Sequence, residues 1–269
     1  MHLDEGRRAA EAGDWVAAGH AFLRAAAEGS AESGESAARV VAELEPLADG
    51  GSAEAAALLA GICLEYLDES DLPTAVRYAR AAADAGLPAG QRLYGHMLAR
   101  ALGVAEDRER ARGLFRAAAQ GGDTCGMFNL AQVTDDPEES LRMLEAAARG
   151  GLVDAGAVLA DRLSAVDRDE EALCWYVRAA ERGHTGAMNA AACWYRDGFG
   201  TEPDPVQAVR WFFVMLAHGD GDGIHEAIQL ARAGALTEQD IREAGRLAGT
   251  PGAAESLIGT ALGDTRTST

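Results

Sequence analysis

A helix-forming segment closed by glycine recurs at near-regular intervals in this chain. The segments end at Gly86, Gly122, Gly151, Gly183 and Gly219. Successive copies therefore lie 36, 29, 32 and 36 residues apart. Most copies are rich in alanine, the strongest helix former, and glycine adopts the left-handed conformation that ends a helix without steric cost. A period of this length predicts stacked two-helix repeats, which bury their apolar faces only against neighbouring repeats.

Small residues at fixed distances after each glycine predict the first helix of each repeat. The fourth residue after the glycine is small in four copies: Gly90, Gly126, Ala155 and Ala187. The ninth residue is small as well: Gly95, Ala131, Ala160 and Ala192. Residues about one turn apart share a helix face, and small side chains on that face let a neighbouring helix approach closely.

An aspartate precedes the second helix in most repeats. Asp71, Asp107, Asp136 and Asp204 each stand four residues before a small residue. Aspartate at a helix start accepts hydrogen bonds from free backbone amides and complements the helix dipole. Pro137 and Pro205 follow directly, at the favoured first helical position. The repeat ending at Gly183 has Arg168 at this place instead.

The stretch GFGTEPDP at residues 198–205 allows two interpretations. Its glycines, carboxylates and threonine would suit an active-site loop. However, the same spacing of a glycine and a following aspartate occurs near residue 101, where Gly103 corresponds to Gly200 and Asp107 to Asp204. We therefore interpret the stretch as a turn between two helices, followed by a helix cap.

Residues 183–219 resemble a Sel-one-like repeat, a relative of the tetratricopeptide repeat. The matching residues are Ala187, Tyr195, Gly198, Gly200, Asp204, Ala208, Trp211 and Gly219. Ala191 and Ala192 depart from the Leu-Gly pair of the family pattern. The resemblance implies an all-α fold, a right-handed α-solenoid of antiparallel helix hairpins. Trp175 and Tyr195 fall on bulky positions of the repeat, so we expect both in the core.

Five such repeats are predicted over residues 52–219. Residues 1–51 are predicted to form a helical hairpin of tetratricopeptide type that turns at Gly13-Asp14, followed by a helix broken or kinked at Pro46. Residues 220–262 are expected to form C-terminal capping helices, with Thr237 and Asp240 spaced as in a capping box. Residues 263–269 are expected to be a disordered tail.

Composition excludes several classes of function. The formal net charge of -19 argues against nucleic-acid and anionic membrane partners. The chain has no apolar run long enough to span a bilayer and no basic-then-apolar leader at its start, so we expect a cytoplasmic protein. Cys63, Cys125, Cys174 and Cys193 show no C-x-x-C pairing, which predicts free, mostly buried thiols.

The strongest candidate for metal chemistry is the stretch HGDGDGIHE at residues 218–226. His218, Asp220, Asp222 and His225 could serve a metal-dependent hydrolase, although the order of ligands is not that of an EF-hand. The competing interpretation is a polar turn between helices. His96 has no nucleophile and carboxylate that can be placed beside it. We therefore expect no enzyme activity, no metal and no cofactor.

In the tetratricopeptide relatives the first helices line a binding groove, and this analogy identifies candidate contact residues. They are Arg92, His96, Phe128, Gln132, Asp161, Asn189 and Arg196. Trp194 lies off the repeat pattern, so we expect it to be exposed and a candidate anchor. The resemblance implies a scaffold or adaptor that binds a protein or peptide, with no small-molecule substrate. A dedicated regulator or inhibitor of one enzyme is the alternative.

Overall fold

The computed structural model describes residues 2–28, 36, 39–66 and 71–263. Throughout these ranges the regular elements are helical and no strand occurs, so the predicted all-α fold is confirmed. The chain divides into two compact units, unit 1 at residues 1–143 and unit 2 at residues 144–269. Part of the predicted N-terminal region, and residues 264–269 of the predicted tail, lie outside the described residues.

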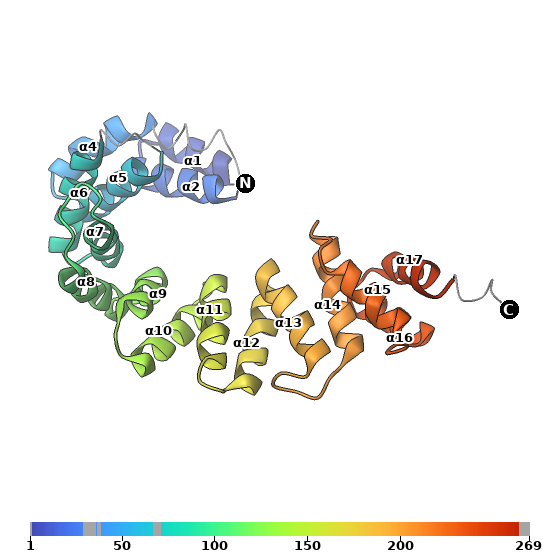
Figure 1. Ribbon diagram of the computed structural model, residues 1–269. Coiled ribbons are helices and arrows are strands. Elements are labelled where there is room, and N and C mark those ends of the chain that lie inside the picture. Colours follow the sequence, from blue (N-terminus) through green and yellow to red (C-terminus); the bar gives the residue numbers. More distant parts are fainter. Residues whose placement is uncertain (1, 29–35, 37–38, 67–70, 264–269) are drawn as a thin grey trace. The chain divides into compact units, whose positions relative to one another are not determined.

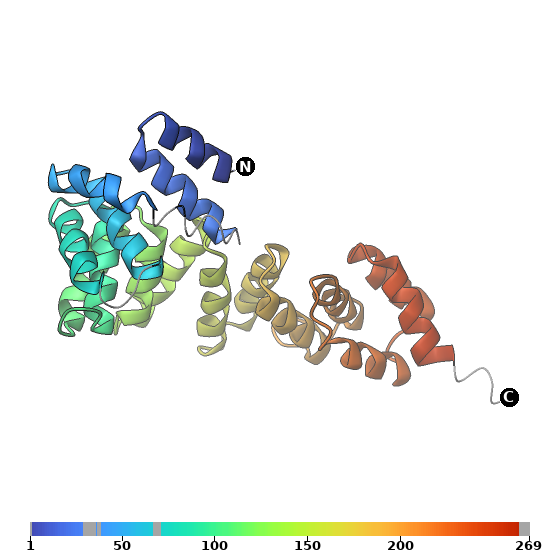
Figure 2. The same ribbon diagram turned by 90° about the horizontal axis from the view of Figure 1, so that it is seen from above.

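Unit 1 is built from antiparallel helix pairs (Figures 1 and 2). Its helices are α1 (His2–Glu11), α2 (Trp15–Ala27), α4 (Val41–Asp49), α5 (Ala53–Tyr66), α6 (Leu72–Asp84), α7 (Pro88–Arg100), α8 (Arg108–Gln120) and α9 (Thr124–Val133). The unit boundary falls within α10 (Pro137–Arg149). The predicted turn at Gly13-Asp14 is confirmed, because Asp14 caps α2 through the Ala17 amide at 3.0 Å.

Unit 2 continues the same pairwise pattern. Its helices are α11 (Val153–Ser164), α12 (Asp169–Glu181), α13 (Thr185–Asp197), α14 (Pro205–Ala217), α15 (Ile224–Arg232), α16 (Glu238–Leu247) and α17 (Pro251–Leu262). Thr237 and Asp240 form the predicted capping box at the start of α16.

A proline inside a helix removes one backbone hydrogen bond, and packing of the helix against its neighbours can offset that loss. In unit 1, α4 runs through Pro46 between the buried Leu44 and Ala48, so of the two outcomes predicted at Pro46, a break or a kink, the break is wrong.

The glycines that define the period all adopt the predicted left-handed conformation. Their φ angles lie between 80° and 108°. In each case the residue after the glycine donates its amide to a carbonyl five residues back, as Leu87 does to Ala82 at 3.1 Å and Asp220 to Met215 at 3.0 Å. These bonds satisfy helix-end carbonyls that would otherwise lack partners. The repeats therefore owe their sharp turns to glycine.

The aspartate caps are confirmed at three of four positions. Asp107 accepts from the Arg110 amide at 2.9 Å, and Asp136 from the Glu138 amide at 3.0 Å. Asp204 accepts from the amides of Val206 and Gln207, each at 3.0 Å. The prediction is wrong for Asp71, whose backbone is already helical and whose side chain makes no cap bond. The GFGTEPDP stretch is thus a turn and a helix cap.

The small residues bring consecutive helices into close contact, as predicted. A Cβ added to Gly90 of α7 would lie 2.6 Å from the backbone of Ala82 in α6. A Cβ added to Gly126 of α9 would lie 2.8 Å from the Cβ atom of Ala118 in α8. Neither distance leaves room for a side chain, so only glycine fits these two crossings.

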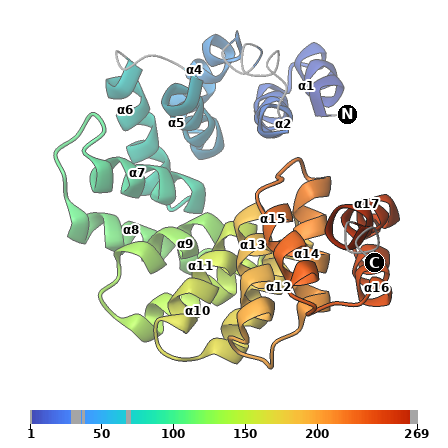
Figure 3. The same ribbon diagram turned by 45° about the vertical axis from the view of Figure 1, so that its right-hand side comes forward.

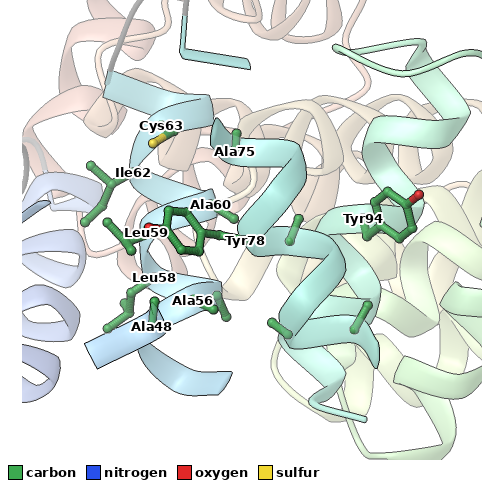
Figure 4. Close-up of a cluster of buried hydrophobic side chains, with 14 of the residues drawn as sticks. Ala48, Ala56, Leu58, Leu59, Ala60, Ile62, Cys63, Ala75, Tyr78 and Tyr94 are labelled. Carbon is green, nitrogen blue, oxygen red and sulfur yellow. The ribbon is translucent and has the colours of Figure 1, made fainter. Parts of the chain in front are cut away.

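The core of unit 1 consists largely of alanine with a few large side chains. Figure 4 shows Tyr78 of α6 pointing toward Leu59 of α5, both fully buried. The buried large residue follows the small one by four positions in some helices, as Phe115 follows Ala111 in α8, and by three in others, as Trp211 follows Ala208 in α14. A separation of three or four keeps both residues on one helix face.

Two residues expected in the core are only half-buried. Trp175 and Tyr195 each retain part of their surface, so that prediction is wrong. Trp175 follows the small Ala172 by three positions and lies at the edge of the buried face, where Arg178 stacks over its ring at 4.8 Å. Its neighbour Tyr176 takes the core position.

All four cysteines are free thiols, but only Cys63 is buried. The expectation of mostly buried cysteines is therefore wrong, because Cys125 and Cys174 lie on exposed helix faces. Burial raises the pKa of the Cys63 thiol to about 11, so this group stays protonated. Within the described ranges, no helix is both long and apolar enough to cross a membrane.

A comparison of Gly200→Ala with Gly219→Ala separates two ways in which alanine at a turn glycine lowers stability: backbone strain and steric overlap. Both positions have a positive φ, so alanine at either costs about 1–2 kcal/mol. A Cβ on Gly200 would also overlap the backbone of Asp169, whereas one on Gly219 meets nothing within 4 Å. We expect Gly200→Ala to lower the free energy of unfolding by a further ~1–3 kcal/mol in chemical denaturation. Equal losses would contradict the close packing of this turn on α12.

Asp204→Ala tests the interpretation of this residue as a helix cap. Loss of the two amide bonds should lower the free energy of unfolding by about 1 kcal/mol. Asp204→Asn retains the accepting oxygen and should remain within a few tenths of a kcal/mol of the parent protein. Thermal denaturation followed by circular dichroism measures both, and equal destabilisation by the two variants would argue against the cap.

Candidate functional site

A cleft of about 590 Å³ opens on one side of unit 1, between α2, α5 and α7. These three helices follow one another along the inner side of this unit, while α4, α6 and α8 lie outside them (Figures 1 and 3). The apolar part of the cleft wall consists of two alanines, Ala57 and Ala89, and five leucines: Leu23, Leu58, Leu64, Leu87 and Leu93. Leu58 is buried, and the other four pack on the core of unit 1 while remaining partly open to solvent.

The carboxylates of Glu54 and Glu65 also line the cleft. Both side chains are exposed, and neither forms an ion pair or hydrogen bond with any residue that the structure describes. Both lie on α5, together with Leu58 and Gly61 of the cleft wall. Residues 54, 58, 61 and 65 are spaced by whole helical turns, so they form one stripe along the helix.

Arg92 lines the cleft but its charge is already neutralised. Its Nε lies 3.2 Å from the carboxylate of Asp123. Asp123 in turn caps α9 by accepting from the Gly126 amide at 2.6 Å. The guanidinium group is half-buried in this arrangement, so Arg92 links α7 to the start of the next helix pair.

Two histidines complete the polar part of the cleft. Burial among the helices lowers the pKa of the His96 imidazole, and the guanidinium groups of Arg100 and Arg92 lower it further, although part of the ring is open to solvent. Burial also lowers the pKa of His20; Arg24 adds to this and Glu54 opposes it. Both shifts favour the neutral imidazole at neutral pH, so the carboxylates of Glu54 and Glu65 give the cleft a net negative charge.

Of the residues predicted for the groove, Arg92 and His96 lie together in this cleft. Phe128 is half-buried on α9 and does not line it. Gln132 lines a different cavity of unit 1, of about 630 Å³, near Arg100, Arg108 and Arg112. Arg108 and Arg112 are paired there with Glu106 and Asp135.

The predicted groove residues of unit 2 make contacts within that unit. Asp161 accepts from the Tyr176 hydroxyl at 2.6 Å. Arg196 holds Asp197 through two bonds of 2.7 Å and Glu226 through one of 2.8 Å. Asn189 is exposed, with the Cys193 thiol 3.8 Å from its Oδ1.

Trp194 is half-buried, so its expected exposure is wrong. Its ring packs edge-on against Tyr176, with centroids 5.1 Å apart, and lies 5.7 Å from Phe199. Of these three rings, Phe199 is the exposed one, at 51%. It lies in the turn between the left-handed Gly198 and Gly200, and the sequence pattern GFG could have indicated this.

Three side chains of the 218–226 stretch, those of His218, Asp220 and Glu226, make separate contacts. The His218 ring lies 2.9 Å from the Val214 carbonyl oxygen, and Asp220 accepts from the Asp222 amide at 3.1 Å. Glu226 is paired with Arg196. In the described part of the chain, no group of three or more His, Cys, Asp or Glu side chains is placed to hold a metal ion.

The contribution of α5 to the cleft was not among the predictions from the sequence. The sequence nevertheless contains a signal, because Gly51 precedes Gly86 by 35 residues, close to the period of the repeats. In the structure Gly51 adopts a φ of 96°, as the later repeat-ending glycines do. Counting from Gly51, the fourth and ninth residues are the fully buried Ala55 and Ala60. The tenth is Gly61, which corresponds to His96 in the next repeat.

Comparisons with known proteins agree with this architecture. The Sel1 repeat family model matches residues 53–87, 88–123, 126–152, 163–184 and 185–213, together more than half of the chain. No curated protein matches the chain significantly.

Two solved structures share the fold. One is a protective antigen present in uropathogenic Escherichia coli strains, displaying an SLR fold (TM-score 0.65, 21% identity, 93% of this chain covered). This chain spans 57% of that antigen's length. The other is a Sel1 repeat protein from Oxalobacter formigenes (TM-score 0.61, 23% identity, covering 80% of this chain and 70% of that one). The resemblance inferred from the sequence is confirmed, and the chain belongs to the Sel1 repeat family.

Proposed function

We propose that this protein is a non-enzymatic adaptor, and that the cleft between α2, α5 and α7 binds a segment of a partner protein. The observation that carries the proposal is the wall of partly exposed leucines on three neighbouring helices. Sel1 repeat proteins generally act as scaffolds for protein–protein interactions, and their fold is typically non-catalytic. Arg92 and His96 would then contribute to recognition from α7.

The form of the cleft favours a peptide segment over a small molecule. A volume of about 590 Å³ accommodates a few side chains, and the cleft is open along one side. Small-molecule sites usually enclose most of the ligand surface. Covering one leucine fully contributes about 1.5–3 kcal/mol, so an inserted apolar side chain would anchor a peptide. Phe128, Gln132, Asp161, Asn189, Trp194 and Arg196 remain predicted contacts for further parts of a partner.

The state of the cysteines supports a cytoplasmic adaptor. All four thiols are free, and two of them are exposed. Free exposed thiols persist in reducing compartments and are oxidised outside them. We therefore propose that the adaptor works in the cytoplasm.

Gly61→Trp tests the cleft by filling it. Gly61 lines the cleft from the middle of α5, and a Cβ added there meets nothing within 4 Å. The indole should therefore occupy the binding space without disturbing the helix. We expect the amount of partner protein recovered from a native extract, quantified by mass spectrometry, to fall by about tenfold, which corresponds to ~1.4 kcal/mol.

Gly113→Trp is the matched control. Gly113 lies on an exposed face of α8 outside the cleft, and an added Cβ also meets nothing within 4 Å. Both variants should keep the helical circular dichroism of the parent protein, and only Gly61→Trp should lose partners. Full recovery of partners by folded Gly61→Trp would contradict the proposed function.

A further inference from the structure

The stripe of residues 54, 58, 61 and 65 on α5 places a carboxylate at each end of an apolar stretch. Glu54 and Glu65 are eleven residues apart, which is about 16 Å along a helix. Leu58 and Gly61 lie between them and line the same cleft. Because Gly61 has no side chain, the middle of the stripe is open above the helix backbone.

No other group in the cleft wall neutralises these two carboxylates. Arg92 is held by Asp123 at 3.2 Å. His20 and His96 favour the neutral imidazole at neutral pH, since burial and neighbouring arginines lower the pKa of both rings. Neither Glu54 nor Glu65 has an ion-pair or hydrogen-bond partner among the described residues. An incoming cation would therefore find two unpaired anions beside an apolar surface.

We infer that the cleft binds a basic segment of its partner, in which an apolar side chain sits over Gly61 among the leucines and flanking arginine or lysine side chains pair with Glu54 and Glu65. This inference rests on the proposed function of the cleft. An extended peptide advances about 3.3 Å per residue, so the two basic residues should stand about five positions apart, with the apolar residue between them. The net charge of -19 would also speed the approach of such a segment.

Panning of random displayed peptides on the full-length protein tests the inference. We expect the recovered peptides to carry pairs of Arg or Lys about five residues apart that enclose Leu, Ile, Met or Phe. One such peptide, labelled with a fluorophore, is then titrated with the parent protein and variants by anisotropy. The double variant Glu54→Gln/Glu65→Gln should bind it about three- to tenfold more weakly. A higher salt concentration should reduce this difference in affinity between the parent protein and the double variant, because dissolved ions screen the charges.

The control is Glu11→Gln/Glu138→Gln, which removes the same charge at two exposed positions outside the cleft that have no ion-pair partner among the described residues. It should bind the peptide as the parent protein does, and Gly61→Trp should abolish binding. Some recovered peptides could lose binding to Gly61→Trp and yet lack basic residues, or bind Glu54→Gln/Glu65→Gln as tightly as the parent protein. That result would contradict recognition of a basic segment but would still support peptide binding in the cleft. Peptides insensitive to Gly61→Trp, or no recovered peptides at all, would overturn the cleft itself.

Discussion

The close crossing of consecutive helices is the constraint on which the rest of each unit depends. At Gly90 the backbone of the preceding helix, and at Gly126 the side chain of Ala118, lies too close for a Cβ to fit. Alanine-rich helices bury little area per residue, so the packing must gain its energy from many short contacts. The left-handed glycine at the end of each second helix sets the angle at which the chain enters that contact.

The same constraint places the cleft. The small residues of a first helix contact its neighbouring helices, as Gly90 of α7 contacts α6 and Gly95 contacts α8, so other positions of that helix remain for the inner side. On α7 these positions hold Arg92 and His96, and the position of His96 is taken by Gly61 on α5. The absence of a side chain at Gly61 opens the space that the leucines surround. The apolar wall and its unpaired carboxylates are thus a consequence of repeat geometry combined with substitutions at single positions.

The sequence predicts the parts of this structure that depend on local backbone chemistry. Glycine turns and the caps at Asp107 and Asp204 follow from neighbouring residues alone. Predictions that depended on burial were less successful, because a shift of one position around a helix moves a side chain from the core to the surface, as at Trp175. The pairing of Arg92 with Asp123 also could not be predicted, since it joins residues on different helices whose spacing is set by packing.

The central claim is that a partner segment occupies the cleft of unit 1, and leucine methyl groups report on this directly. Methyl spectra of the leucine-labelled protein, recorded during titration with a panned basic peptide, would locate the contact. We expect shifts at Leu23, Leu64 and Leu93, which line the cleft, and none at the exposed Leu216 of unit 2. Shifts confined to Leu216 and other leucines outside the cleft would contradict the claim.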